Sequence, residues 1–386
     1  MQKKSYLSFI NNPVITSETP YKQECITKTN AFNAFWEAHN LPGFPEPLVL
    51  SPKPRIYRTT SKRSLQYNGQ QCSLVYTADK VKTKNEAAAL LEPLEHGKLY
   101  QFLATQFNTP LFGKCGRNLN YVIVRGNYTE RTLIFNAKQL NASVVKKLSA
   151  LADLCRKQDP NLISSFLFSD PSGSAYYLDT LPRTGAGKVK KFFGPAKLLN
   201  KLDGLYLYYD PFSFSQINQS LVPELIAAAE EFLKPSTSHR LIDLYCGYGL
   251  FALALGRKCA GVFGMDSNRG SIESVEFSAQ KARPPIKSRF KNAPVTAQTV
   301  STAIPKKINK DELLVLDPPF SGTEKGVIPA LAERGPSKVI HLFCNVDRVP
   351  AELKIWMRCG YKARSVKLFD MFPGTPNLEI MVALER

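Results

Sequence analysis

Residues 241–256, LIDLYCGYGLFALALG, join an apolar run to a glycine turn and then to a second apolar run. The first run is typical of a buried strand that ends at Tyr245, and the second is typical of a helix. Gly247-Tyr248-Gly249 make the turn between them. Small residues there let the backbone approach a cofactor, and a helix N-terminus favours a carboxylate or phosphate.

The next strand-like run, GVFGMD (261–266), ends in Asp266, where an acid suits ribose hydroxyls. A glycine turn followed by an acid does not separate NAD from S-adenosylmethionine. The third glycine of the phosphate-binding pattern is absent, because Ala252 stands at that position. A turn that merely packs a helix on a strand is the structural alternative.

The same alternation extends over residues 205–386. VPELIAAAEEFL (222–233) has the spacing of an amphipathic helix, and short apolar runs like those above recur between helical segments. The strand-like runs are HRLIDLYCG (239–247), GVFGMD (261–266), DELLVLD (311–317) and SKVIHLFC (337–344). This predicts an α/β fold: a doubly wound, Rossmann-like, mainly parallel sheet with helices on both faces.

The rest of the chain predicts a smaller α+β region before that domain. We expect a basic N-terminal region over 1–95 with possible RNA contacts, and a central subdomain over 96–204. Within the subdomain the patterns favour a helix over 142–157, a loop or linker over 183–204, and several strands. The expected strands are LNYVIVRG (119–126), RTLIFNA (131–137), SSFLFSD (164–170) and SAYYLDT (174–180).

The composition is ordinary except for its charge. Lys and Arg number 51 against 32 Asp and Glu, so the 386 residues carry a net charge of +19. A chain this basic favours a polyanionic partner, since phosphate neutralisation releases counterions; simple solubility is the alternative. The sequence has no run long enough for a membrane span or signal-peptide core. We therefore expect a cytoplasmic monomer without membrane contacts.

Cysteine and histidine spacing argues against metal chemistry. The chain has eight cysteines without a C-x-x-C pair and four scattered histidines. We therefore expect neither a metal site nor an iron–sulfur cluster.

Two residues placed at strand ends could carry chemistry. LLVLDPPF (313–320) brings Asp317 to the end of a strand, where doubly wound enzymes put active sites. By itself this loop resembles that of methyltransferases acting on amino groups of adenine or cytosine. Cys344 ends another strand on the same edge, although a strand cysteine is more often a core residue.

Glu379 lies between Leu378 and Ile380 in an apolar strand. A carboxyl group at such a place has a raised affinity for protons and could serve as a base; a glutamate facing water is the alternative. Gln216 and Asn218 follow two phenylalanines before a helix. There, Asn218 or Ser220 could simply cap the helix.

Taken in chain order, these motifs resemble the RNA uracil-C5 methyltransferase family, which makes 5-methyluridine in tRNA and ribosomal RNA. The matching pieces are FSFSQIN (212–218), DLYCGYGLF (243–251), DPP (317–319), CN (344–345) and FDMFPGTPNLE (369–379). The resemblance implies a class I methyltransferase domain over 205–386, S-adenosylmethionine as cofactor and RNA as partner.

The family's residue roles transfer onto matching positions. The resemblance implies that Cys344 is the nucleophile and Glu379 the proton acceptor. We also expect Phe320 and Asn345 at the substrate base. The residues that the resemblance assigns to the cofactor site and the adjoining base pocket are Gln216, Tyr245, Gly247, Gly249, Asp266 and Asp317.

The chain departs from the family pattern in places. Phe320 stands where the family has arginine, and Asn377 where it often has histidine; Val346-Asp347-Arg348 replace a proline and threonine. Two alternatives stay open: an amino-group methyltransferase that uses residues 317–320, and a non-catalytic RNA-binding protein on this scaffold. An NAD-dependent oxidoreductase would explain neither the charge nor the Cys and Glu pair.

Overall fold

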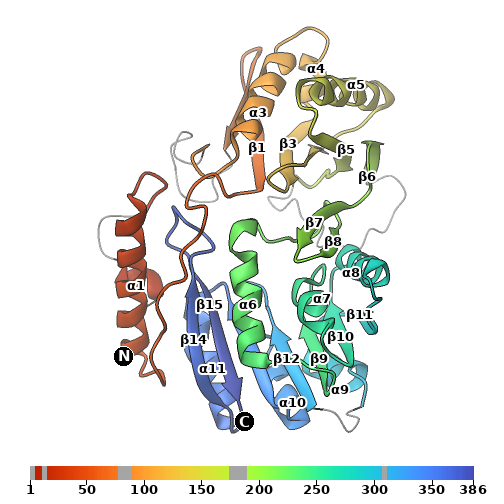
Figure 1. The fold of residues 1–386 in the computed structure, drawn as a ribbon. Coiled ribbons are helices and arrows are strands. Elements are labelled where there is room, and N and C mark those ends of the chain that lie inside the picture. Colours follow the sequence, from red (N-terminus) through yellow and green to blue (C-terminus); the bar gives the residue numbers. More distant parts are fainter. Residues whose placement is uncertain (1–4, 11–14, 77–88, 174–188, 307–310) are drawn as a thin grey trace. The chain divides into compact units, whose positions relative to one another are not determined.

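A computed structural model describes residues 5–10, 15–76, 89–173, 189–306 and 311–386 (Figure 1). The chain forms two compact units. Unit one comprises Met1–Pro54, Asn200–Tyr209 and Ser213–Arg386, and unit two comprises Arg55–Leu199 and Asp210–Phe212. This division differs from the boundaries expected near residues 95 and 204. The first 54 residues share a unit with the C-terminal domain, while the remainder of the expected basic region does not.

Unit one is built on a seven-stranded sheet of order β11-β10-β9-β12-β13-β15-β14. Strands β9 to β13 are parallel, and β15 is antiparallel to both of its neighbours. The strands are β9 His239–Leu244, β10 Gly261–Asp266, β11 Ser288–Asn292, β12 Asp311–Leu316, β13 Lys338–Phe343, β14 Lys362–Phe369 and β15 Glu379–Glu385. The doubly wound prediction is confirmed. The order reverses between β9 and β12, which is where such sheets open a crevice.

Alternation along β9 shows how the two faces are covered. Ile242 and Leu244 enter the large core, while Asp243 accepts a hydrogen bond from the start of α7 (Leu250–Gly256) on the other face. Helices α6 (Val222–Leu233) and α8 (Arg269–Lys281) pack on the sheet beside α7. The helices that contribute to the large core are α9 Ala297–Ala303, α10 Val327–Arg334 and α11 Val349–Arg358.

The N-terminal segment also belongs to that core. It contains the 3-10 turn η1 (Tyr6–Phe9) and helix α1 (Tyr21–Ala38). Tyr6, Phe32 and Phe35 form edge and tilted ring contacts, with centroids 6.1 to 6.4 Å apart. All three are buried among sheet residues. Burial of rings this large is worth roughly 2–3 kcal/mol each, so α1 is a structural part of unit one.

Unit two carries a six-stranded sheet of order β2-β1-β3-β4-β5-β6. Helices α3 (Leu94–Phe107) and α5 (Ala142–Gln158) cover one face, with the four-residue α4 (Gly113–Gly116) beside them. Its strands are β1 Thr60–Asn68, β2 Gln71–Tyr76, β3 Leu119–Gly126, β4 Arg131–Ala137, β5 Leu162–Ser169 and β6 Val189–Phe193. The strands expected at 119–126, 131–137 and 164–170 and the helix at 142–157 are confirmed.

The expected loop over 183–204 is wrong where the structure describes it. Residues 189–193 form β6, which pairs with β5, and Leu198–Leu202 form β7, which pairs with β8 (Leu205–Tyr209). Pairing with a neighbouring strand stabilises these segments, although their Lys- and Gly-rich composition does not predict strands. The strand expected at 174–180 lies outside the described residues. Among the described helices, none has the length and apolarity to cross a membrane.

Candidate active site

Four ionisable side chains gather at one edge of the large sheet. Asp266 ends β10, Asp317 follows β12 and Cys344 follows β13. Glu379 begins β15. Because β15 runs antiparallel to β13, its first residue lies at the edge where the parallel strands finish. Topology therefore brings residues far apart in sequence to one rim.

The strand register sets Cys344 beside Glu379. Phe343 pairs with Ile380 in the β13–β15 ladder, so one step further along brings Cys344 level with Glu379. Side chains directly opposite in an antiparallel pair point to the same face, with Cβ atoms about 4.5–5.5 Å apart. Glu379 itself pairs with Phe369 of β14, which fixes it from the other side. The thiol and the carboxyl group thus face one small volume.

The carboxyl groups of the rim are desolvated. Burial, followed by the charge of Asp317, raises the pKa of Glu379 well above its usual range. Burial and the charge of Asp266 raise the pKa of Asp317 to about 7. Burial also raises the pKa of Asp266, against hydrogen bonds to its carboxylate. An ionised Glu379 is therefore a stronger base than an ordinary carboxylate.

The thiol of Cys344 is equally disfavoured as an anion. Burial is the main cause that raises its pKa to about 12, and the charges of Glu379 and Asp317 add to it. A nucleophilic cysteine is ordinarily activated by a lowered pKa, and the pKa of Cys344 is shifted in the opposite direction. Because burial is the largest cause, the neutral thiol is the favoured form in this environment, and the two neighbouring carboxyl groups favour it further when they are ionised.

The glycine turn after β9 has strained backbone geometry. Tyr245 has φ 62°, a left-handed value that is uncommon for a residue with a side chain, and Gly247 has φ 52°. The Gly247 N–H donates to Asp266 Oδ2 at 2.9 Å, and the Asn268 N–H donates to Asp266 Oδ1 at 2.7 Å. Such strain persists only where surrounding bonds hold it, and it clusters at ligand sites.

Two neighbouring positions explain how the turn is packed. A Cβ added to Gly249 would collide with Val275 of α8, so glycine is needed there for close helix approach as well as for its φ of 90°. Asp243 accepts from Ala252 N at 2.7 Å, while its Oδ1 is buried without a partner. Burial raises the pKa of Asp243 well above its usual range. Sequence reasoning missed Asp243, although an acid within an apolar strand was the available signal.

The loop after Asp317 is held from both sides. Its Asp317 N–H donates to Leu244 O at 3.3 Å, and the Phe320 carbonyl accepts from Asn345 Nδ2 at 3.0 Å. Asn345 Oδ1 accepts from Asp347 N, so both ends of this amide contact main chain. Phe320 is 66% exposed, which leaves it accessible to a nucleic-acid base. Asn345 joins the two loops that follow β12 and β13.

Asn218 has a role that differs from the helix cap considered above. It precedes the 3-10 turn η2 (Gln219–Leu221) without a side-chain capping bond. Its Nδ2 donates to Ser51 Oγ at 3.0 Å and to Met371 O at 3.2 Å. Gln216 is buried two residues earlier, and within the described residues no interaction joins it to the rim acids. The segment before α6 thus supports the loop that leads to Glu379.

The described residues hold no cluster of three or more His, Cys, Asp or Glu side chains suited to a metal ion.

Comparison with known proteins identifies the C-terminal half. Residues 201–386 match the family model described as tRNA (Uracil-5-)-methyltransferase. This stretch, just under half of the chain, is similar to the RNA uracil-C5 methyltransferase family. The resemblance that the motifs carried is thereby confirmed for this part of the chain.

Individual relatives agree with the family match. The 23S rRNA (uracil(1939)-C(5))-methyltransferase RlmD of Tolumonas auensis is 29% identical over 186 residues, which cover 48% of this chain and 42% of that protein. The RlmD of Photorhabdus laumondii is 26% identical over 346 residues, covering 88% of this chain and 72% of that protein. The chain thus spans less than half the length of some of the curated relatives it matches.

A solved structure shows the same fold. The tRNA (uracil-54, C5)-methyltransferase of Pyrococcus abyssi superposes with a TM-score of 0.65 at 19% identity, covering 95% of this chain and 83% of that chain. This likeness supports the class I methyltransferase architecture, with strand β15 antiparallel to the rest of the sheet.

Proposed function

We propose that this protein transfers a methyl group from S-adenosylmethionine to C5 of a uridine in structured RNA, tRNA or rRNA, through a covalent adduct of Cys344 with C6. The observation that carries the proposal is the placement of Cys344 level with Glu379 on one rim, beside Asp317. The P. abyssi neighbour, which was solved with S-adenosyl-L-homocysteine, and the RlmD relatives support the same cofactor and substrate class.

The cofactor site is the turn after β9. Tyr245, Gly247 and Gly249 form the wall, Asp266 offers a carboxylate at the strand end, and Asp317 closes the far side. We assign Gln216 to the same pocket from the family pattern. The strained φ of Tyr245 and the two backbone donors that fix Asp266 fit a built ligand site. S-adenosylmethionine supplies an electrophilic methyl group when bound there.

The chemistry needs a nucleophile because C5 of uracil is too weak to attack a methyl group. The Cys344 thiol loses its proton to solvent, and the thiolate adds to C6, so that C5 gains enolate character. After C5 has acquired the methyl group, Glu379 takes the C5 proton; the C5=C6 bond re-forms and the C6–S bond breaks. The raised pKa of Glu379 suits proton acceptance from carbon.

Access to the base requires that the uridine leave its stack. The exposed ring of Phe320 is placed to stack on an extruded base, and the net charge of +19 favours contact with the RNA backbone. Phosphate contacts position an RNA without specifying its sequence.

The test is nucleoside mass spectrometry of total RNA from a deletion strain after incubation with the protein and cofactor. We expect 5-methyluridine from the wild-type protein and none from Cys344→Ala. Methylation that survives this substitution contradicts the mechanism. A gain of amino-methylated adenosine or cytidine that Phe320→Arg abolishes supports the amino-group alternative. Tight RNA binding without cofactor binding in calorimetry supports the non-catalytic one.

A further inference from the structure

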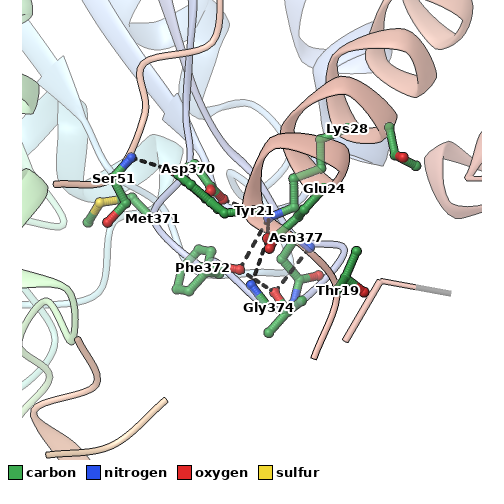
Figure 2. A network of polar contacts seen from close by, with 12 residues as sticks. Thr19, Tyr21, Glu24, Lys28, Ser51, Asp370, Met371, Phe372, Gly374 and Asn377 are labelled. Atoms are coloured by element: carbon green, nitrogen blue, oxygen red, sulfur yellow. Dashed lines mark hydrogen bonds and ion pairs between the residues drawn. The ribbon is translucent and has the colours of Figure 1, made fainter. Parts of the chain in front are cut away.

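The loop that leads into Glu379 is fastened to α1 by a fully buried ammonium group (Figure 2). Lys28 Nζ donates to Asp370 Oδ1 at 2.6 Å, to Glu24 Oε1 at 2.8 Å and to the Phe372 carbonyl at 3.3 Å. Glu24 Oε1 also accepts from Gly374 N at 2.6 Å. The side chains of Lys28, Glu24 and Asp370 have 0% exposure.

This arrangement is directional. An ammonium group has three protons, and Lys28 directs them to three acceptors. Two of these acceptors lie on the loop, and one of those is main chain. A buried charge is tolerated when it is paired and fully hydrogen-bonded, and removal of one partner leaves the others uncompensated. Lys28 and Glu24 therefore fix the loop at 370, 372 and 374.

The fixed loop is the connection that ends in the base. Phe369 and Glu379 are the last pair of the β14–β15 ladder, so residues 370–378 close a hairpin at its active-site end. The Asp370 N–H donates to Val49 O at 3.0 Å, and Leu378 beside Glu379 is buried. A shift of the loop therefore moves the first residue of β15, whose carboxyl group must reach the C5 proton.

The same N-terminal segment reaches the other catalytic loop. Asp347, three residues after Cys344, accepts from Tyr6 N at 2.6 Å and from Ser5 Oγ at 2.7 Å. Asp347 is one of the residues that replace the family's proline and threonine. The described residues of η1 and α1, with Ser5 before η1, thus contact both loops that hold the proposed catalytic pair.

We propose that Lys28 is a positioning residue for Glu379: through Asp370 and the Phe372 carbonyl it holds the loop that aims this carboxylate at C5. The inference rests on the proposed function, in which Glu379 removes the C5 proton. Its consequence is specific. Loss of Lys28 slows the second half of the reaction, proton removal and release of the thiolate, and leaves the first half intact.

The experiment separates the two halves. Total RNA from a deletion strain grown on [5-³H]uridine is incubated with full-length protein and [methyl-¹⁴C]S-adenosylmethionine. Carbon-14 in RNA reports methyl transfer, tritium in water reports proton removal, and a protein–RNA band in a denaturing gel reports the adduct. We expect Lys28→Met to lower the tritium release rate by about 10–100-fold, the loss that follows a misplacement near 1 Å. A ¹⁴C-labelled adduct should accumulate, with KM for RNA unchanged within about twofold.

Matched variants control for trivial causes. Lys22→Met makes the same substitution on the exposed face of α1 and should behave as wild type. Glu379→Gln gives the signature of a lost base, and if it releases tritium normally the proposed function fails. If Glu379→Gln accumulates adduct while Lys28→Met releases tritium at the wild-type rate, or slows methyl transfer and release in parallel, the Lys28 proposal is overturned and the proposed function stands.

If Lys28→Met fails to fold, which lost S-adenosylmethionine binding in calorimetry would show, a second variant still tests the proposal. Glu24→Gln keeps the side-chain volume and an acceptor for Gly374 N while removing one charge from the cluster. We expect it to bind cofactor normally and to lower tritium release by roughly 3–10-fold with adduct accumulation. Release at the wild-type rate in this variant overturns the proposal.

Discussion

A buried charged group in unit two is paired and hydrogen-bonded, whereas the buried carboxyl groups at the rim of unit one have no cationic partner among the contacts described above. In unit two, Arg63 forms two bonds to Glu92, at 2.6 and 3.1 Å, and its guanidinium lies 3.3 Å from the Tyr76 ring centroid and 4.4 Å from that of Tyr100. Beside the rim, Asp243 has one side-chain oxygen without a partner, and burial raises the pKa values of Asp317 and Glu379 on the rim itself. Satisfied charges fix a conformation, whereas unsatisfied ones lower stability and remain available for chemistry.

The comparison predicts opposite effects of removing charge in the two places. Glu379→Gln should lower methylation turnover by about 10²–10⁴-fold, the usual contribution of a positioned base. The same change should raise the midpoint of denaturant unfolding, because a desolvated carboxyl group is replaced by a neutral amide of equal size. Steady-state methylation and urea unfolding measure the two effects. If Glu379→Gln loses stability along with activity, the Glu379 carboxyl group stabilises the fold, as Arg63 does, and the contrast is wrong.

In unit two, Arg63→Met should destabilise the unit by about 3–5 kcal/mol, since Glu92 is left buried without its partner. S-adenosylmethionine binding to unit one should be unchanged. The double variant Arg63→Met/Glu92→Leu should recover most of the loss. Denaturant unfolding followed by hydrogen exchange of β1 and β3 measures the effect, and equal stability of the single and double variants would show that the pair is not coupled.

The raised pKa of Cys344 predicts a steep pH dependence of its reactivity. Below a pKa of about 12, each pH unit increases the thiolate fraction about tenfold. The rate of Cys344 alkylation by iodoacetamide should therefore rise without a plateau between pH 7 and 10, as measured by peptide mass spectrometry. A plateau near neutral pH would reveal an activating group on the rim.

Asp317 gives the smallest expected effect. Its pKa rises on folding from 3.8 to about 7, so its contribution to stability is present at low pH and is lost as pH rises through that window. Asp317→Asn should therefore increase the free energy of unfolding by roughly 1–3 kcal/mol at pH 8 and by little at pH 4. Thermal unfolding at both values checks the sign; a larger gain at pH 4 contradicts the assigned cause.

The sequence predicted the large sheet well because its strands are buried on both faces and read as apolar runs, such as DELLVLD. It also placed Asp317 and Cys344 at one edge, because parallel topology brings strand ends together. Glu379 reaches that edge through strand β15, whose antiparallel direction the sequence did not predict. The sequence could not predict β6 and β7, because these segments are rich in Lys and lie near Gly, and pairing with neighbouring strands stabilises them. Nor could it predict the cluster of Lys28 and Asp370, which joins residues 342 positions apart. Local patterns do not encode such long-range pairs.

The central claim is a covalent bond between Cys344 and the target uridine. The most direct measurement uses RNA transcribed with 5-fluorouridine, whose fluorine cannot be removed as the C5 proton is, so that the adduct persists after methyl transfer. Incubation with S-adenosylmethionine, followed by protease and nuclease digestion and mass spectrometry, locates the bond. We predict a methylated fluorouridine fragment on the peptide containing Cys344 and none in Cys344→Ala. An adduct on another cysteine, or methylated product without any adduct, would contradict the account.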